Sequence, residues 1–220
     1  MLDDVLPEDV RPRLASSALV TVDVQRDTLD GGALEIAGTS AALGHMAELA
    51  RAFRAARQPI VHIVRLYLAD GSNADPVRRA AVAHGGPMLR PGTDGSELAA
   101  GLLPDPGLTL DPDALLRGDA QSIGPAEVVL YKPRWGAFFG TALESHLRDA
   151  EVDTVVLCGA NFPNCPRTTI YEASERDLRV VVAEDAVSGL YPQGVAELRA
   201  IGAAVAPAAD IVAALAAAVS

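Results

Sequence analysis

The chain has 220 residues, half of them hydrophobic, which is enough for one well-buried domain of ordinary to large size. Its formal net charge of -11 is spread along the sequence, and such a surface repels phosphate backbones and anionic lipid, so neither nucleic acid nor a membrane is an expected partner. No stretch is long and apolar enough to span a bilayer, and the first eight residues lack the basic and apolar regions of a signal peptide. We therefore expect a cytoplasmic protein.

The first third of the chain predicts a strand, a helix and a second strand. Residues 18–24 (ALVTVDV) and 60–66 (IVHIVRL) are short, mostly apolar runs, as in strands buried on both faces. Residues 39–57 have helical periodicity, and Thr39 or Ser40 is the expected N-cap.

The segment 67–125 is rich in Gly, Pro and Asp and is long for a connection. We expect it to carry short helices, such as one over 96–103, and to cover a functional site, as long connections often do. The rest of the chain alternates strands and helices in this order: strand 128–131, helix 141–150, strand 154–158, helix 166–177, strand 179–183, helix 195–201, strand 203–206 and a last helix that begins at Pro207.

This alternation of continuous apolar strands with helices indicates a mainly parallel, six-stranded sheet covered on both faces. The expected fold is a single doubly wound, three-layer α/β/α domain over residues 1–220. In such folds, ligands bind beyond the carboxyl ends of the strands, near the point where strand order reverses. The turn after the first strand is not Gly-rich, which argues against a dinucleotide-binding version of the fold.

Three reactive side chains follow three of the predicted strands. Cys165 lies at the start of a helix, where unpaired N–H groups and the helix dipole lower the pKa of a thiol and can hold an oxyanion, and Arg167 would add positive potential. Asp23 could take the thiol proton, and Lys132 could hold both negative charges. Each residue also has a structural explanation when taken alone: an inert Cys, a capping Asp and a solvated Lys. A purely structural interpretation would require all three explanations to hold at the same edge of the sheet, and this favours a functional site.

The other cysteine and the histidines are better explained as structural residues than as ligands or nucleophiles. Cys158 ends an apolar strand, as an inert buried thiol would, and both cysteines are expected to be reduced. The four histidines have no metal-ligand spacing, so neither a metal nor a cofactor is expected; they are His45, His62, His84 and His146.

At the three reactive segments the chain resembles the isochorismatase-like cysteine hydrolases, over residues 15–206. That superfamily includes nicotinamidases, N-carbamoylsarcosine amidases, ureidoacrylate amidohydrolases, biuret amidohydrolases and streptothricin hydrolase. Asp23 and Gln25 match its first motif and residues 132–141 its lysine motif. The residues that match its nucleophile motif are Gly159, Ala160, Asn161 and Cys165.

The resemblance implies an amidohydrolase that cleaves a C–N bond of a small molecule through a thioester, with Asp23, Lys132 and Cys165 as catalytic residues. It also implies a cis peptide between Ala160 and Asn161, and an oxyanion hole made by the N–H groups of Asn161 and Cys165. The expected assembly is a homodimer or homotetramer. Four further residues are expected to line the substrate pocket: Gln25, Arg134, Trp135 and Phe162.

The chain also departs from some relatives. Nicotinamidases hold a metal with an Asp-x-His pair after the second strand, where this chain has no His in 65–73, so nicotinamidase itself is not expected. The run FPNCP at 162–166 is closer to other subtypes, streptothricin hydrolase among them.

Two alternatives stay open, and the presence of the three reactive residues argues against both. One is a vinyl-ether hydrolase acting on isochorismate, which does not need the cysteine, and the other is a non-catalytic binding domain on the same fold. An enzyme is expected to show fast alkylation of Cys165 at neutral pH while Cys158 stays slow.

Overall fold

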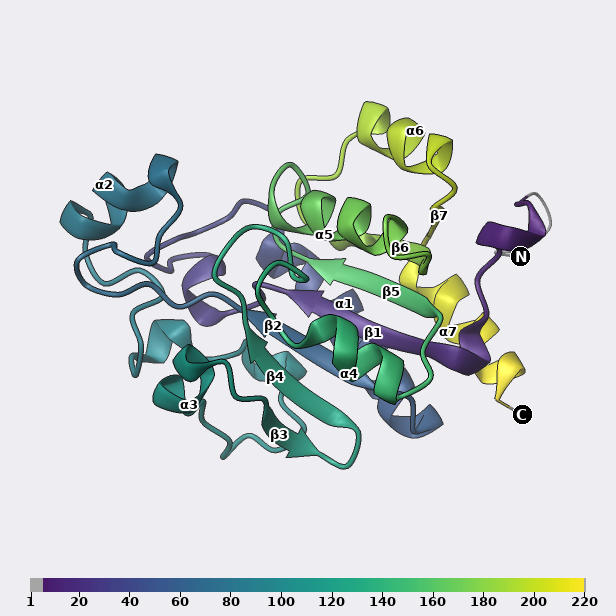
Figure 1. Ribbon diagram of the computed structural model, residues 1–220, viewed down its shortest axis with the longest axis horizontal. Coiled ribbons are helices and arrows are strands. Elements are labelled where there is room, and N and C mark those ends of the chain that lie inside the picture. Colours follow the sequence, from purple (N-terminus) through teal and green to yellow (C-terminus); the bar gives the residue numbers. More distant parts are fainter. Residues whose placement is uncertain (1–5, 220) are drawn as a thin grey trace.

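The computed structural model describes residues 6–219; residues 1–5, on which the expected absence of a signal peptide partly rests, and residue 220 lie outside the described residues. Seven strands of this range form one sheet in the order β3-β4-β2-β1-β5-β6-β7 (Figure 1). Their bounds are β1 Ser17–Val22, β2 Ile60–Val64, β3 Gln121–Gly124, β4 Glu127–Tyr131, β5 Thr154–Gly159, β6 Arg179–Val187 and β7 Ala204–Ala206.

Helices cover both faces of this sheet, which confirms the three-layer α/β/α fold. Figure 1 shows α4 and α5 in front of the sheet, and α1 and α7 behind it. The helix bounds are α1 Thr39–Ala56, α2 Pro76–His84, α3 Pro112–Arg117, α4 Leu143–Asp149, α5 Cys165–Ser174, α6 Pro192–Ala200 and α7 Ala208–Ala218. No helix within residues 6–219 is long and apolar enough to cross a membrane.

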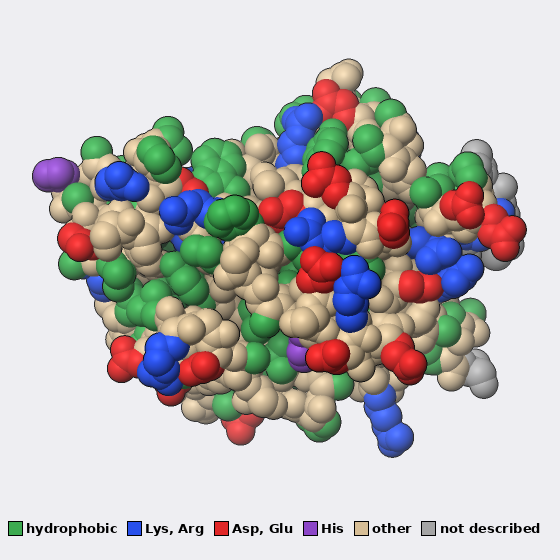
Figure 2. Space-filling view, viewed as in Figure 1, with side chains coloured by type: hydrophobic (Ala, Val, Ile, Leu, Met, Phe, Trp, Pro, Cys, Tyr) green, Lys and Arg blue, Asp and Glu red, His purple; other side chains and the backbone are tan. Residues whose placement is uncertain are grey.

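The central strands are buried along their whole length and are mostly apolar, because helices cover both of their faces. β1 pairs in parallel with β2 on one side and with β5 on the other, so that Leu19 lies beside Ile60 and Val156. All residues of β1, β2 and β5 are buried. On the surface drawn in Figure 2, acidic and basic side chains are interspersed rather than gathered into one patch. That arrangement fits a net charge that serves solubility.

The sheet has one strand more than the six predicted. β3 adds to the edge antiparallel to β4, with Gln121 opposite Val129. This strand has four residues that are exposed or partly exposed, so it has no apolar run that sequence periodicity could detect.

Two local predictions were wrong. Residues 96–103 form no continuous helix: short 3-10 helices at Asp94–Ser96 and Ala100–Leu102 flank Leu98, which bridges to Gln25. The N-cap of α1 is Gly38, with a left-handed φ of 85°, and not a hydroxyl residue. The hydroxyl of Thr39 donates to Ser188 and that of Ser40 accepts from the N–H of Asp30, so neither is free to cap the helix.

The strand order reverses between β1 and β5, and the ends of these two strands lie unusually close together. Gly159, with a φ of 131°, approaches Val22 so closely that a Cβ atom there would lie 2.2 Å from the Val22 carbonyl oxygen. Only glycine permits this approach. It brings the segment that leads from β5 into α5 next to the residue after β1, which is Asp23.

Candidate active site

Asp23 is held in a backbone conformation that few residues adopt. Its φ is 54°, in the left-handed region, and its N–H donates to the carbonyl of Ile63 at 2.9 Å. Oδ2 lies 2.9 Å from the Nζ of Lys132, whereas Oδ1 is buried and has no hydrogen-bond partner among residues 6–219. The carboxylate therefore has one oxygen fixed by an ion pair and one oxygen free to accept a proton.

Lys132 is a buried partner and not a solvated strand-end residue. Its side chain is 1% exposed, and Nζ also donates to the carbonyl of Arg134 at 3.2 Å. Burial lowers the pKa of the ammonium, but the charges of Asp23 and Cys165 raise it by more, so the net pKa lies above its usual value. Lys132 is also the only lysine of the chain, since the other 17 of its 18 basic residues are arginines.

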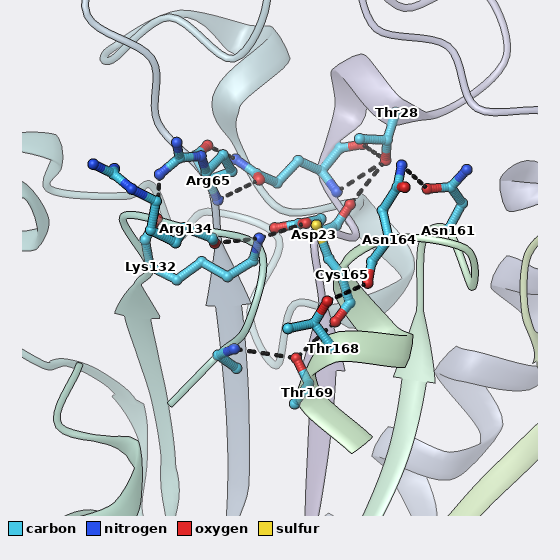
Figure 3. Close-up of polar contacts among 12 residues, drawn as sticks. Asp23, Thr28, Arg65, Lys132, Arg134, Asn161, Asn164, Cys165, Thr168 and Thr169 are labelled. Carbon is cyan, nitrogen blue, oxygen red and sulfur yellow. Dashed lines mark hydrogen bonds and ion pairs between the residues drawn. The ribbon is translucent and has the colours of Figure 1, made fainter. Parts of the chain in front are cut away.

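Cys165 is the first residue of α5 and lies beside both of these charges (Figure 3). Burial and then the Asp23 carboxylate raise the pKa of its thiol to about 12, while Lys132 acts in the opposite direction. The expectation of a lowered thiol pKa was therefore wrong, because burial outweighs the favourable helix start. Arg167 adds nothing to this balance at close range, since its guanidinium binds Glu197 at 2.6 Å and the Tyr191 hydroxyl at 2.8 Å.

Two backbone N–H groups beside the thiol are unused. The peptide bond between Ala160 and Asn161 is cis, and the N–H of Ala160 donates to the carbonyl of Val22 at 2.9 Å. The N–H groups of Asn161 and Cys165, in contrast, donate to no other residue in the described part of the chain. Free N–H donors at a helix start can bind an oxygen atom that develops negative charge.

A narrow cavity of about 20 Å³ connects these groups, with room for about one water molecule. Its buried wall contains Asp23 and Lys132 together with Arg65, Tyr67 and Asp75. Its partly exposed rim consists of Leu34, Ile36, Arg78, Trp135, Asn161 and Cys165.

The polar residues after β2 were missed by sequence reasoning. Arg65 donates to the carbonyl of Lys132 at 2.7 Å and pairs with Asp75 at 3.3 Å, and its guanidinium lies 4.7 Å from the ring centre of Tyr67. This buried arginine holds the backbone of the lysine in place. The signal was available, because Arg65 directly follows an apolar strand just as Asp23 and Lys132 do.

Of the four residues predicted to line the pocket, the structure places one, Trp135, at the cavity. Gln25 is fully buried, and its side chain is occupied by backbone groups of Arg65 and Ser96. Phe162 is fully buried in the core, where its ring packs edge-to-face on Tyr191 with 5.4 Å between the ring centres. The guanidinium of Arg134 donates to the carbonyl groups of Asn73 and Pro133.

The site contains no constellation suited to a metal. Across residues 6–219 there is no group of three or more His, Cys, Asp or Glu side chains placed to hold an ion. His62, the only buried histidine in that range, lies inside β2 and bonds to Thr21 and Glu127.

Comparison with known proteins places this arrangement in a family. The model of the isochorismatase domain matches residues 113–212. A ureidoacrylate amidohydrolase from Methylorubrum extorquens is 31% identical over 201 residues, which cover 87% of this chain and 77% of that protein. The chain belongs to the isochorismatase-like cysteine hydrolase superfamily.

Two further similar proteins show that family membership alone does not establish activity. The crystal structure of an isochorismatase family protein from Desulfovibrio vulgaris is 32% identical with a TM-score of 0.76, and the match covers 91% of this chain and 98% of that one. A probable inactive nicotinamidase from Arabidopsis thaliana is 26% identical, covering 82% of this chain and 85% of that protein. Family membership therefore supports hydrolase chemistry, while activity in a given member depends on its own site residues.

Proposed function

We propose that this protein is a cysteine-dependent amidohydrolase that cleaves a C–N bond of a small molecule, and that the single domain expected over the chain carries this activity. The observation that carries the proposal is the meeting of Asp23, Lys132 and Cys165 in one cavity, with a lone unpartnered carboxylate oxygen among them. A structural ion pair would satisfy both oxygens of a buried carboxylate.

Acylation begins from a protonated thiol, because its raised pKa keeps Cys165 neutral at pH 7. Asp23 accepts the thiol proton as the sulfur attacks the amide carbonyl, and Lys132 stabilises the thiolate that forms. The carbonyl oxygen, now negatively charged, is bound by the free N–H groups of Asn161 and Cys165. When the C–N bond breaks, Asp23 gives the same proton to the leaving amine, and the acyl group remains on sulfur as a thioester.

Deacylation repeats these roles with water. Asp23, again a carboxylate, accepts a proton from a water molecule, and the resulting hydroxide adds to the thioester carbonyl. The intermediate then expels the sulfur, which regains its proton from Asp23, and the product leaves as a carboxylic or carbamic acid. No step consumes an oxidant, a reductant or a cofactor.

The experiment that tests this proposal is a screen of small amides and carbamoyl compounds for release of ammonia or amine, and of lactams and cyclic imides for ring opening, which adds the mass of one water molecule. Cys165→Ala should lose all turnover while keeping its circular dichroism spectrum. The matched control is Cys158→Ala, which changes the other, fully buried thiol and should keep turnover if it folds. Turnover by Cys165→Ala would refute the mechanism.

The same screen, with isochorismate added to the compounds, separates the two alternatives. A vinyl-ether hydrolase would act on isochorismate and would keep its activity in Cys165→Ala. A binding domain would release neither ammonia nor amine from any compound, although it could still be stabilised by one of them.

A further inference from the structure

The charged residues of the cavity pair with one another except for one. Asp23 pairs with Lys132 at 2.9 Å, and Arg65 pairs with Asp75 at 3.3 Å. The fifth charged residue is Arg78, in the first turn of α2, and its side chain forms no hydrogen bond or ion pair with any residue of 6–219. The cavity therefore carries one uncompensated positive charge, in a chain whose net charge is -11.

Arg78 is placed at the rim and not in bulk solvent. Its guanidinium lies 5.9 Å from the ring centre of Trp135, the only tryptophan of the chain, and both side chains are partly exposed. Its charge is also felt by the buried phenol of Tyr67, which lies close enough to Asp23 to sense that carboxylate as well. Tyr67 thus connects the rim that holds Arg78 to the reactive end of the cavity.

The cavity is too small to hold a whole substrate molecule. A free volume of about 20 Å³ near Cys165 leaves room for little more than the scissile group itself. The rest of the molecule has to extend towards the rim, where the unpaired guanidinium and the indole lie. A guanidinium with no protein partner is suited to a carboxylate, which it can bind through two parallel hydrogen bonds.

We propose that the substrate carries a carboxylate on the side of the molecule away from the scissile bond, and that Arg78, supported by Trp135, binds it. This proposal rests on the amidohydrolase function and narrows its substrates to small anionic amides and carbamoyl compounds. Arg78 then acts as a specificity-determining residue, because a neutral analogue would leave its charge unpaired.

A pair of alkylating reagents tests the anion site without requiring turnover. N-Iodoacetylglycine and N-iodoacetylglycinamide have the same length and the same leaving group, but only N-iodoacetylglycine carries a negative charge, at the end away from the reactive carbon. At pH 9, the rates of modification of Cys165 by the two reagents are measured by mass spectrometry of the peptide that contains it. The quantity of interest is the ratio of the N-iodoacetylglycine rate to the N-iodoacetylglycinamide rate.

The ratio should be about tenfold higher in the wild type than in Arg78→Gln, the factor that 1.4 kcal/mol represents. Arg78→Lys, which keeps the charge but not the fork of donors, should retain part of the preference. The matched control is Arg79→Gln, which removes an exposed arginine of the same helix that does not line the cavity, and it should leave the ratio unchanged.

Equal ratios in the wild type and Arg78→Gln would overturn the anion site, and so would an equal loss in Arg79→Gln. Failure of N-iodoacetylglycine to modify wild-type Cys165 would overturn it too, because a site that takes a small substrate with a distal carboxylate has to admit this reagent. None of these results bears on whether Cys165 is the nucleophile. That claim is tested separately, by the turnover of Cys165→Ala.

Discussion

Replacing Lys132 by methionine should destabilise the fold far more than replacing an exposed basic residue. The Nζ of Lys132 lies 2.9 Å from Oδ2 of Asp23, and the two side chains are 1% and 9% exposed. At an effective dielectric constant of about 20, the attraction at that distance is about 6 kcal/mol. Lys132→Met keeps the apolar stem of the side chain but removes the partner of Oδ2. Because Oδ1 has no hydrogen-bond partner either, the Asp23 carboxylate would then be buried without any partner. Breaking a buried pair in this way costs about 3–5 kcal/mol.

The assay is urea unfolding followed by far-ultraviolet circular dichroism, with the free energy of unfolding taken from the midpoint and slope. The control is Arg117→Met, which breaks an exposed pair with Asp119 at 3.1 Å and should cost less than about 1 kcal/mol. The double variant Asp23→Asn/Lys132→Met should recover part of the loss, because it contains no unpaired charge. A loss below about 1 kcal/mol for Lys132→Met, or no recovery in the double variant, would refute this account of the ion pair.

Three further predictions follow from the titrating groups. Protein labelled with ¹⁵N-lysine has one lysine side-chain signal, whose pKa should lie above the ordinary value. That pKa should be lower in Asp23→Asn, where the larger of the two charges that oppose the effect of burial is removed; an unchanged pKa would contradict the pairing. Because the pKa of the Cys165 thiol is raised to about 12, its alkylation should be slow at pH 7, contrary to the sequence-based expectation. The rate should rise about tenfold per pH unit up to pH 10, while Cys158 stays unmodified. A rate that does not depend on pH would contradict the raised pKa. Burial raises the pKa of Glu127, but its hydrogen bonds to Arg54 and His62 outweigh burial and lower that pKa to about 2. The stabilising contribution of Glu127 is therefore present above pH 4.5 and is lost as the pH falls towards 2. Unfolding at pH 2–5 should depend on pH less steeply in Glu127→Gln, by about 2–3 kcal/mol over that range, and equal slopes would contradict the prediction.

The parts of the fold that the sequence predicted are those that depend on local periodicity. Runs such as 154–158 are continuous and apolar, and a buried parallel strand is the structure that such runs favour. The short edge strand β3 has no such run, because its four residues are not fully buried and its register is set by pairing with β4. Long-range pairing of this kind leaves no periodic trace.

The site shows the same division. Asp23, Lys132 and Cys165 could be placed together because each follows a parallel strand, and topology fixes where such ends meet. Gln25 and Phe162 lie close to them in sequence, yet both side chains turn into the protein interior, which depends on packing with distant segments. The unpaired state of Arg78 could not be predicted either, since it depends on where every acidic side chain of the surrounding loops has found a partner.

The most direct test of the central claim is the mass of the peptide that contains Cys165 during turnover of a compound found in the screen. Rapid acid quenching should trap an increment equal to the acyl part of that substrate, on Cys165 and not on Cys158, and the increment should vanish when hydroxylamine is added. An acyl increment on any other residue, or turnover that continues in Cys165→Ala, would contradict the account.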